Sequence, residues 1–192
     1  RAIIGNPPPV LTQAEYEAEV NALIPKLNIP DGIEKFTYAS CVWVFERVRA
    51  GGGLGIFAHP YWISDVFQVP ESLTDYLAET HPFDAYEVLG GENYYQQNGF
   101  QTVKYYEDRA KGRDYPVVGS TDSHNSIATD NRNALICSTF VFAKANERTA
   151  LVDAVKGRYS VAVDSISPDI RLVGDFRLVK YTRFIIEEFT PL

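Results

Sequence analysis

The hydrophobic and polar positions of the chain follow two periods in turn, which predicts strands alternating with helices. Short apolar runs rich in valine, isoleucine and phenylalanine are typical of buried strands, and longer stretches with apolar residues three or four positions apart are typical of helices. Strands are predicted at 54–58, 84–89, 115–120, 134–143 and 159–164, and helices at 14–27, 40–50, 70–80, 94–111, 146–158 and 175–189. This alternation predicts an α/β domain built from βα units, with a parallel sheet or barrel.

Local signals predict where some of these helices begin and end. TQAE, from Thr12 to Glu15, is a capping-box pattern at the start of the first helix. The glycines after Ala50 predict the end of the second helix. Asn146 is a candidate N-cap for the helix at 146–158.

Composition limits the classes of protein to consider. The chain has 192 residues, enough for one domain with a hydrophobic core. No apolar run is long enough to span a membrane. Cys41 and Cys137 are too few for a disulfide framework, so a reducing, cytoplasmic location is expected. The net charge of -7 argues against binding long nucleic acid, although bound cations would still allow an acidic substrate.

Candidate chemistry gathers where predicted strands end. His59 follows the strand at 54–58, Glu87 lies near the end of 84–89, and Asp122 and His124 follow 115–120. In parallel α/β folds, active sites form at the carboxyl ends of strands. Asp122 and His124 are two positions apart, so in an extended loop both point to the same side and suit Zn, Mn or Fe.

Each of these residues also has a structural interpretation. Asp122 could cap a turn with His124 at the surface, and His59, held stiffly before Pro60, could be a core histidine. Glu87 could be a ligand, a base, or a partner that orients a histidine, with Glu92 as the alternative in the following loop. His81 falls at the opposite edge of the predicted sheet and is interpreted as structural.

Other catalytic patterns are weak or missing. Ser120 and Ser123 flank Asp122, but the chain has no G-x-S-x-G elbow. Its glycine-rich AGGGLG stretch precedes a strand rather than opening a helix, which is the wrong context for a phosphate-binding loop. Cys137 lies inside an apolar strand and is expected to be inert.

The stretches GIFAHP, FDAYEV and VVGSTDSHN, in this order and on alternating strands, resemble the PHP domain, named for polymerase and histidinol phosphatase. The resemblance covers Leu54 to Asp164, and the last helix is similar to the tail of an uncharacterised branch of that superfamily. It implies a distorted (β/α)7 barrel that holds two or three divalent metals and hydrolyses phosphate esters with a metal-activated water. By this resemblance His59, Asp122 and His124 are metal ligands, Glu87 is a residue of the catalytic pocket, and Arg132 could contact the substrate phosphate.

The chain departs from the PHP pattern at its start. The first motif of the family is His-x-His, and no histidine precedes His59. The chain also begins at Arg1, contains no methionine and opens with a proline-rich stretch. We therefore expect residues 1–192 to form a single domain, the larger, C-terminal part of a PHP-like barrel whose first strands are missing. It remains open whether this fragment is active.

The sequence therefore predicts a cytoplasmic metal-dependent phosphoesterase that acts on a small phosphate ester or nucleotide. One alternative is an amidohydrolase-like barrel that uses the same kinds of ligand on C–N bonds. Others are a degenerate barrel that binds without catalysis and a domain whose polar strand ends only cap turns. The sequence leaves the substrate, the metal and the oligomeric state open.

Overall fold

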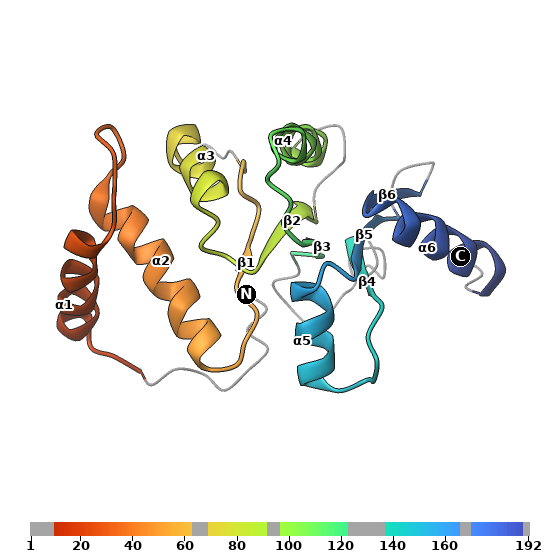
Figure 1. Ribbon diagram of the computed structural model, residues 1–192, viewed down its shortest axis with the longest axis horizontal. Coiled ribbons are helices and arrows are strands. Elements are labelled where there is room, and N and C mark those ends of the chain that lie inside the picture. The colour runs from red at the N-terminus through yellow and green to blue at the C-terminus, as the bar shows by residue number, and fades with distance from the viewer. Residues whose placement is uncertain (1–9, 63–68, 92–96, 123–136, 166–169, 190–192) are drawn as a thin grey trace, which may run out of the picture.

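The computed structural model describes residues 10–62, 69–91, 97–122, 137–165 and 170–189 (Figure 1). Its helices are α1 (Gln13–Leu23), α2 (Lys35–Ala50), α3 (Glu71–Thr80), α4 (Gly99–Ala110), α5 (Arg148–Lys156) and α6 (Phe176–Phe189), with a short 3₁₀ turn at Ile24–Lys26. Its strands are β1 (Ile56–Phe57), β2 (Ala85–Leu89), β3 (Val117–Gly119), β4 (Cys137–Val141), β5 (Ser160–Asp164) and β6 (Arg171–Gly174). The predicted α/β class is confirmed.

The capping box predicted for the first helix is present. Thr12 Oγ1 accepts a hydrogen bond from the Glu15 N–H (3.3 Å), and Glu15 Oε2 accepts one from the Thr12 N–H (2.8 Å). Helix α1 ends at Leu23, short of the predicted end, because Pro25 has no N–H to continue the helical bonds.

The ends of α2 show one correct prediction and one missed signal. The helix begins at Lys35, earlier than expected, because the Glu34 carboxylate accepts the N–H groups of Phe36 (3.1 Å) and Thr37 (2.6 Å). It ends at Ala50 as predicted, and Gly52 takes a left-handed conformation (φ 72°) that suits glycine.

The predicted cap of α5 is wrong. Helix α5 begins at Arg148, so Glu147 and not Asn146 occupies the N-cap position, and no side chain caps the helix there. The chain from Phe142 reaches the helix in an extended conformation at Glu147 (φ -131°), which leaves Asn146 one residue too early to cap it.

The first sheet contains β1, β2 and β3 in that order, all parallel, as the alternation of strands and helices predicts. The second sheet contains β4, β5 and β6, all antiparallel, so a parallel arrangement is wrong for this part of the chain. Helix α5 packs Val152 and Val155 against Ala85 and Val118 of the first sheet. Because β4 and β5 are antiparallel, α5 does not form a crossover between parallel strands. The described residues contain two small sheets and not a closed barrel.

Strand β3 joins the two sheets. Ser160 Oγ donates a hydrogen bond to the Val117 carbonyl (2.8 Å), and Thr139 Oγ1 donates to the Gly119 carbonyl (2.7 Å) while accepting the Gly119 N–H (3.0 Å). A Cβ atom on Gly119 would collide with the backbone of Ser138, so this approach requires glycine. The sheets are thus held together through side chains at both ends of β3.

The first sheet is covered on both faces. On one face, α4 contributes Tyr105 to a cluster that also contains Tyr86, Tyr115 and Phe83. The rings of Tyr86 and Tyr115 lie 5.3 Å apart, and so do those of Phe83 and Tyr115. On the other face, α5 covers the apolar residues noted above. The strand ends are therefore the accessible parts of this sheet.

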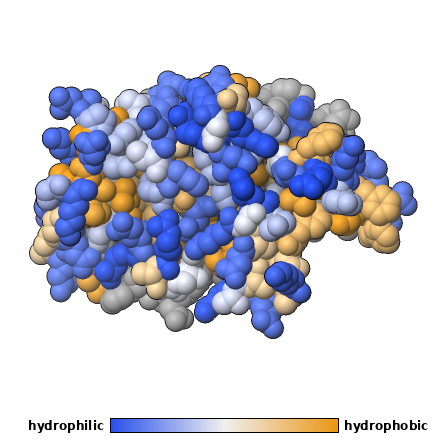
Figure 2. All heavy atoms as spheres, viewed as in Figure 1, coloured by the Kyte–Doolittle hydropathy of each residue, from blue (hydrophilic) through white to orange (hydrophobic). Residues whose placement is uncertain are grey.

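The face of the molecule seen in Figure 2 is mostly hydrophilic. Figure 2 shows hydrophobic atoms gathered at the end of the molecule where Figure 1 places α6. Phe176, Phe184 and Phe189 of this helix are all more than half exposed. None of the helices in the described ranges has the length and apolar character that crossing a membrane requires.

Candidate functional site

Three of the predicted site residues lie at the carboxyl ends of neighbouring parallel strands. His59 follows β1, Glu87 lies in β2, and Asp122 follows β3. Because these strands are adjacent and parallel, their ends meet at one edge of the sheet. All three residues line one small pocket of about 10 Å³, which is room for about one water molecule.

Glu87 is buried at the base of this pocket, with 2% of its surface exposed, whereas His59 and Asp122 are exposed. Its carboxylate oxygens accept hydrogen bonds from the backbone N–H of His59 and from the hydroxyl of Ser120. Burial raises the pKa of Glu87; the two hydrogen bonds lower it in part, and the nearby Asp122 raises it. Glu87 thus ties the turn after β1 to the turn after β3.

The two exposed residues have uncommon backbone conformations. His59 has a φ of 33° and Asp122 a φ of 49°, in the left-handed region that residues other than glycine rarely adopt. Histidine and aspartate tolerate this region better than most residues, but Pro60 restricts His59 further. Such conformations persist only where surrounding contacts hold them, and they cluster at binding sites.

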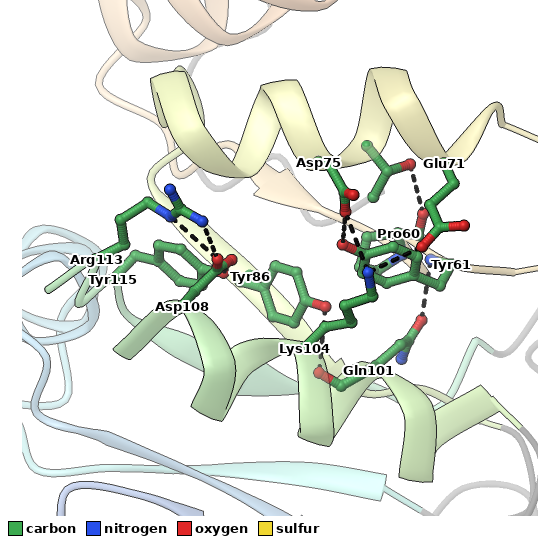
Figure 3. Close-up of polar contacts among 11 residues, drawn as sticks. Pro60, Tyr61, Glu71, Asp75, Tyr86, Gln101, Lys104, Asp108, Arg113 and Tyr115 are labelled. Atoms are coloured by element: carbon green, nitrogen blue, oxygen red, sulfur yellow. Dashed lines mark hydrogen bonds and ion pairs between the residues drawn. The ribbon is translucent and has the colours of Figure 1, made fainter. Parts of the chain in front are cut away.

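Helices α3 and α4 hold the turn after β1 (Figure 3). Thr74 Oγ1 donates to the Pro60 carbonyl (2.9 Å), and the Tyr61 hydroxyl donates to Asp75 (2.6 Å). The Tyr61 N–H donates to Gln101 Oε1 (3.5 Å). Burial, followed by the bond to Asp75, raises the pKa of Tyr61, so its hydroxyl remains a donor. The turn is therefore fixed on both sides.

Lys104 connects the same two helices. Its ammonium group lies 2.8 Å from Glu71 and 3.6 Å from Asp75, and 5.4 Å from the centre of the Tyr61 ring (Figure 3). The hydrogen bond to Glu71 raises the pKa of Lys104, which keeps it charged. These contacts are structural, since they hold α3 against α4 behind the pocket.

The turn after β2 is held by a buried amide. Asn98 Oδ1 accepts the Gly90 N–H (2.8 Å), and Asn98 Nδ2 donates to the Gly90 carbonyl (3.0 Å). Cys137 Sγ donates to the same carbonyl (2.8 Å). A Cβ atom on Gly91 would collide with the carbonyl of Thr121, so the turns after β2 and β3 are in direct contact.

Sequence reasoning missed Asn98 and Gln101. Both line the pocket and both are 99% buried, yet in the sequence they look like ordinary polar positions of a helix. Asn98 is the residue before α4 and Gln101 lies in its first turn, and their spacing of three residues, which places both on one face, is the only signal the sequence offers. What they bond to depends on tertiary structure.

Cys137 matches the interpretation made from the sequence. Burial raises the pKa of its thiol to about 12, so it is a poor nucleophile. Both cysteines are free. His81 lies at the other end of the sheet, as expected, where it ends α3 and packs against the rings of Phe83 and Tyr115.

Four residues singled out from the sequence lie outside the described residues. They are His124, Arg132, Ser123 and the alternative carboxylate Glu92. Their predicted roles therefore stay predictions.

The donors around the pocket suit a divalent metal in kind. One imidazole and two carboxylates are ligands of Zn, Mn or Fe. Within the described ranges, however, no three histidine, cysteine, aspartate or glutamate side chains lie close enough to hold a metal ion. Both oxygens of Glu87 also already accept hydrogen bonds. A metal site here therefore needs ligands from elsewhere, and His124, two positions after Asp122, is the nearest along the chain.

Comparison with protein-family models, with curated proteins and with solved structures found no match to this chain.

Proposed function

We propose that this chain belongs to a metal-dependent phosphoesterase of the PHP type and is folded as a partial barrel. One observation carries the proposal: three adjacent parallel strands bring His59, Glu87 and Asp122 to a single pocket at their carboxyl ends. The uncommon backbone conformations of His59 and Asp122 add support, because they shape the two turns that carry the proposed ligands.

In this proposal His59, Asp122 and His124 hold the metal, which is Zn, Mn or Fe. A bound divalent metal would activate a water and neutralise charge on a phosphate ester. Glu87 shapes the pocket by accepting the His59 N–H and the Ser120 hydroxyl, and so fixes two ligand-bearing turns relative to one another. Arg132 would contact the substrate phosphate. A complete domain of this type would hold two or three metals.

The substrate in this proposal is a small phosphate ester or a nucleotide. The described pocket is too small for more than a water, so the substrate would bind at its mouth, beside the exposed His59 and Asp122. The net charge of -7 disfavours long nucleic acid.

Hydrolysis assays test the reaction class. The parent chain, supplied with Mn²⁺ or Zn²⁺, should hydrolyse an aryl phosphate and leave an aryl amide intact, and the His59→Ala/Asp122→Ala variant should lose this activity. His81→Ala is a matched control, because His81 lies at the other end of the sheet. Amide cleavage without phosphate hydrolysis would favour the amidohydrolase-like alternative and contradict the proposal.

A degenerate barrel that binds without catalysis is the second candidate. It is favoured by the absence of a three-ligand group among the described residues and by the small volume of the pocket. This candidate predicts that neither the aryl phosphate nor the aryl amide is hydrolysed. It also predicts that the parent and the His59→Ala/Asp122→Ala variant bind the same amount of metal, whether or not the parent binds any.

A further inference from the structure

A larger space lies at the opposite, amino end of the first sheet. This cleft, which we call the amino-edge cleft, has a volume of about 480 Å³ and is bounded by the starts of β3 and β5, the ends of α4 and α5 and the start of α6. Small-molecule sites commonly fall in this size range. The cleft shares no lining residue with the pocket at the carboxyl ends.

The amino-edge cleft carries excess positive charge in an acidic chain. Its charged residues are Arg109, Arg158, Arg177, Asp114 and Asp175. Asp114 holds two of the guanidinium groups on its two oxygens, with Arg158 Nη1 at 2.7 Å and Arg109 Nε at 3.6 Å. Two cations beside one carboxylate leave a net positive charge that can attract a further anion. Guanidinium groups bind phosphate and carboxylate through two parallel N–H donors.

The backbone of Arg158 is unusual in a way that shapes the cleft. Its φ of 66° lies in the left-handed region, at the position after a helix where glycine is preferred. The Arg158 N–H donates to the Val155 carbonyl and the Tyr159 N–H to the Ala154 carbonyl, each at 2.8 Å, which completes the turn. An arginine thus occupies a position that favours glycine, and its side chain reaches Asp114 in the cleft.

Flat aromatic surface is exposed beside these cations. Tyr159 and Tyr181 line the cleft with 55% and 62% of their surfaces exposed, while Tyr105 and Tyr115 are buried beneath. A Cβ atom on Gly157 would lie 3.0 Å from the Tyr159 ring, so the ring lies closely over this glycine. Exposed tyrosine faces can stack on a planar ring.

We propose that the amino-edge cleft binds a small anion that carries a planar ring. Arg158 and Arg109 would bind the anionic group, and Tyr159 or Tyr181 would stack on the ring. This site is independent of the proposed phosphoesterase site, because the two share no residues.

Calorimetric titration with adenosine monophosphate in EDTA tests this site without metal. The parent chain should bind the nucleotide, and Arg158→Gly should weaken binding by about ten-fold or more, because it removes a charge-assisted contact. Glycine suits the left-handed backbone, so this variant should fold like the parent. Arg148→Ala removes one positive charge at the other end of α5, outside the cleft, and should bind like the parent.

Further titrations show where the nucleotide binds and how much its phosphate and its adenosine each contribute. Inorganic phosphate and adenosine should each bind more weakly than the nucleotide, and Tyr181→Leu should weaken nucleotide binding more than phosphate binding. The His59→Ala/Asp122→Ala variant should bind the nucleotide like the parent. The proposal is overturned by absence of nucleotide binding in the parent, by equal binding in Arg158→Gly, or by loss of binding in the His59→Ala/Asp122→Ala variant.

Discussion

The pocket at the carboxyl end of the first sheet and the amino-edge cleft hold their polar residues in opposite ways. At the carboxyl end, a buried carboxylate holds two turns together around a pocket of about 10 Å³. At the amino end, exposed and mutually paired charges surround a cleft of about 480 Å³. The residues that look catalytic in sequence thus line the smaller space, because strand order determines which residues meet, whereas the packing of helices and turns determines how much room remains.

This comparison predicts that the stability of the chain depends more on Glu87, the buried acceptor in the pocket, than on Asp114, the exposed acceptor in the amino-edge cleft. Glu87→Ala should lower the free energy of unfolding by about 2–4 kcal/mol, because the His59 N–H and the Ser120 hydroxyl lose a buried acceptor. Asp114→Ala should cost less than about 1 kcal/mol, because its ion pairs are exposed. Urea unfolding of both variants measures the difference.

Glu87→Gln serves as the control for this pair. It keeps an oxygen acceptor and the size of the side chain, so it should cost less than Glu87→Ala. Equal losses in Glu87→Ala and Asp114→Ala would contradict the contrast between the two ends.

Substitutions at two glycines, one beside the pocket and one in the amino-edge cleft, test the same comparison with smaller expected losses of stability. Gly91→Ala should cost about 2 kcal/mol, because the added Cβ meets the backbone carbonyl of Thr121, which cannot move without shifting the turn after β3. Gly157→Ala should cost less, about 1 kcal/mol, because the added Cβ lies 3.0 Å from the exposed ring of Tyr159, which can move, and 3.1 Å from the Asp153 carbonyl, which is tight but short of the collision at Gly91. Urea unfolding of both variants measures the two losses. A larger loss of unfolding free energy in Gly157→Ala than in Gly91→Ala would contradict this contrast.

The smallest expected effect is a pH dependence at the amino end. Burial lowers the pKa of His81 below its ordinary value of 6.5; Arg49 also lowers it, while Asp84 raises it. The unfolded chain therefore binds the proton more readily, and stability present above pH 6.5 is lost as the pH falls through the folded pKa. His81→Asn removes this titration and tolerates the left-handed backbone (φ 50°).

Thermal or urea unfolding between pH 5 and pH 8 measures this dependence. The difference in stability between parent and His81→Asn should become smaller, or favour the variant, as the pH falls. A difference that stays constant over this range would contradict a lowered pKa of His81 in the folded chain.

Much of the first sheet could be predicted from the sequence, because its signals are local. Apolar runs at 54–58, 84–89 and 115–120 mark β1, β2 and β3, and the alternation with helices predicts their parallel order. Parallel neighbouring strands place their carboxyl ends at one edge of the sheet, which brings His59, Glu87 and Asp122 to one pocket. Local patterning was sufficient for these three strands, each of which is followed by a turn or helix that the sequence also marks.

The rest depends on contacts that no local pattern encodes. The strand β6 is short and leads directly into α6, so its apolar residues merge with the pattern of the helix. The antiparallel pairing of β4 with β5 and the packing of α5 against the first sheet both join segments that no local pattern relates. The bonds of Asn98 to Gly90 and the amino-edge cleft exist only once separate elements have met.

Elemental analysis of the purified parent chain, beside the His59→Ala/Asp122→Ala variant and the His81→Ala control, tests the central claim most directly. The account predicts that the parent and His81→Ala bind a divalent metal and that the double variant does not. Metal retained by the double variant, or no metal bound by the parent even when Zn²⁺ or Mn²⁺ is supplied, would contradict the assignment of a metal site in this chain to His59 and Asp122.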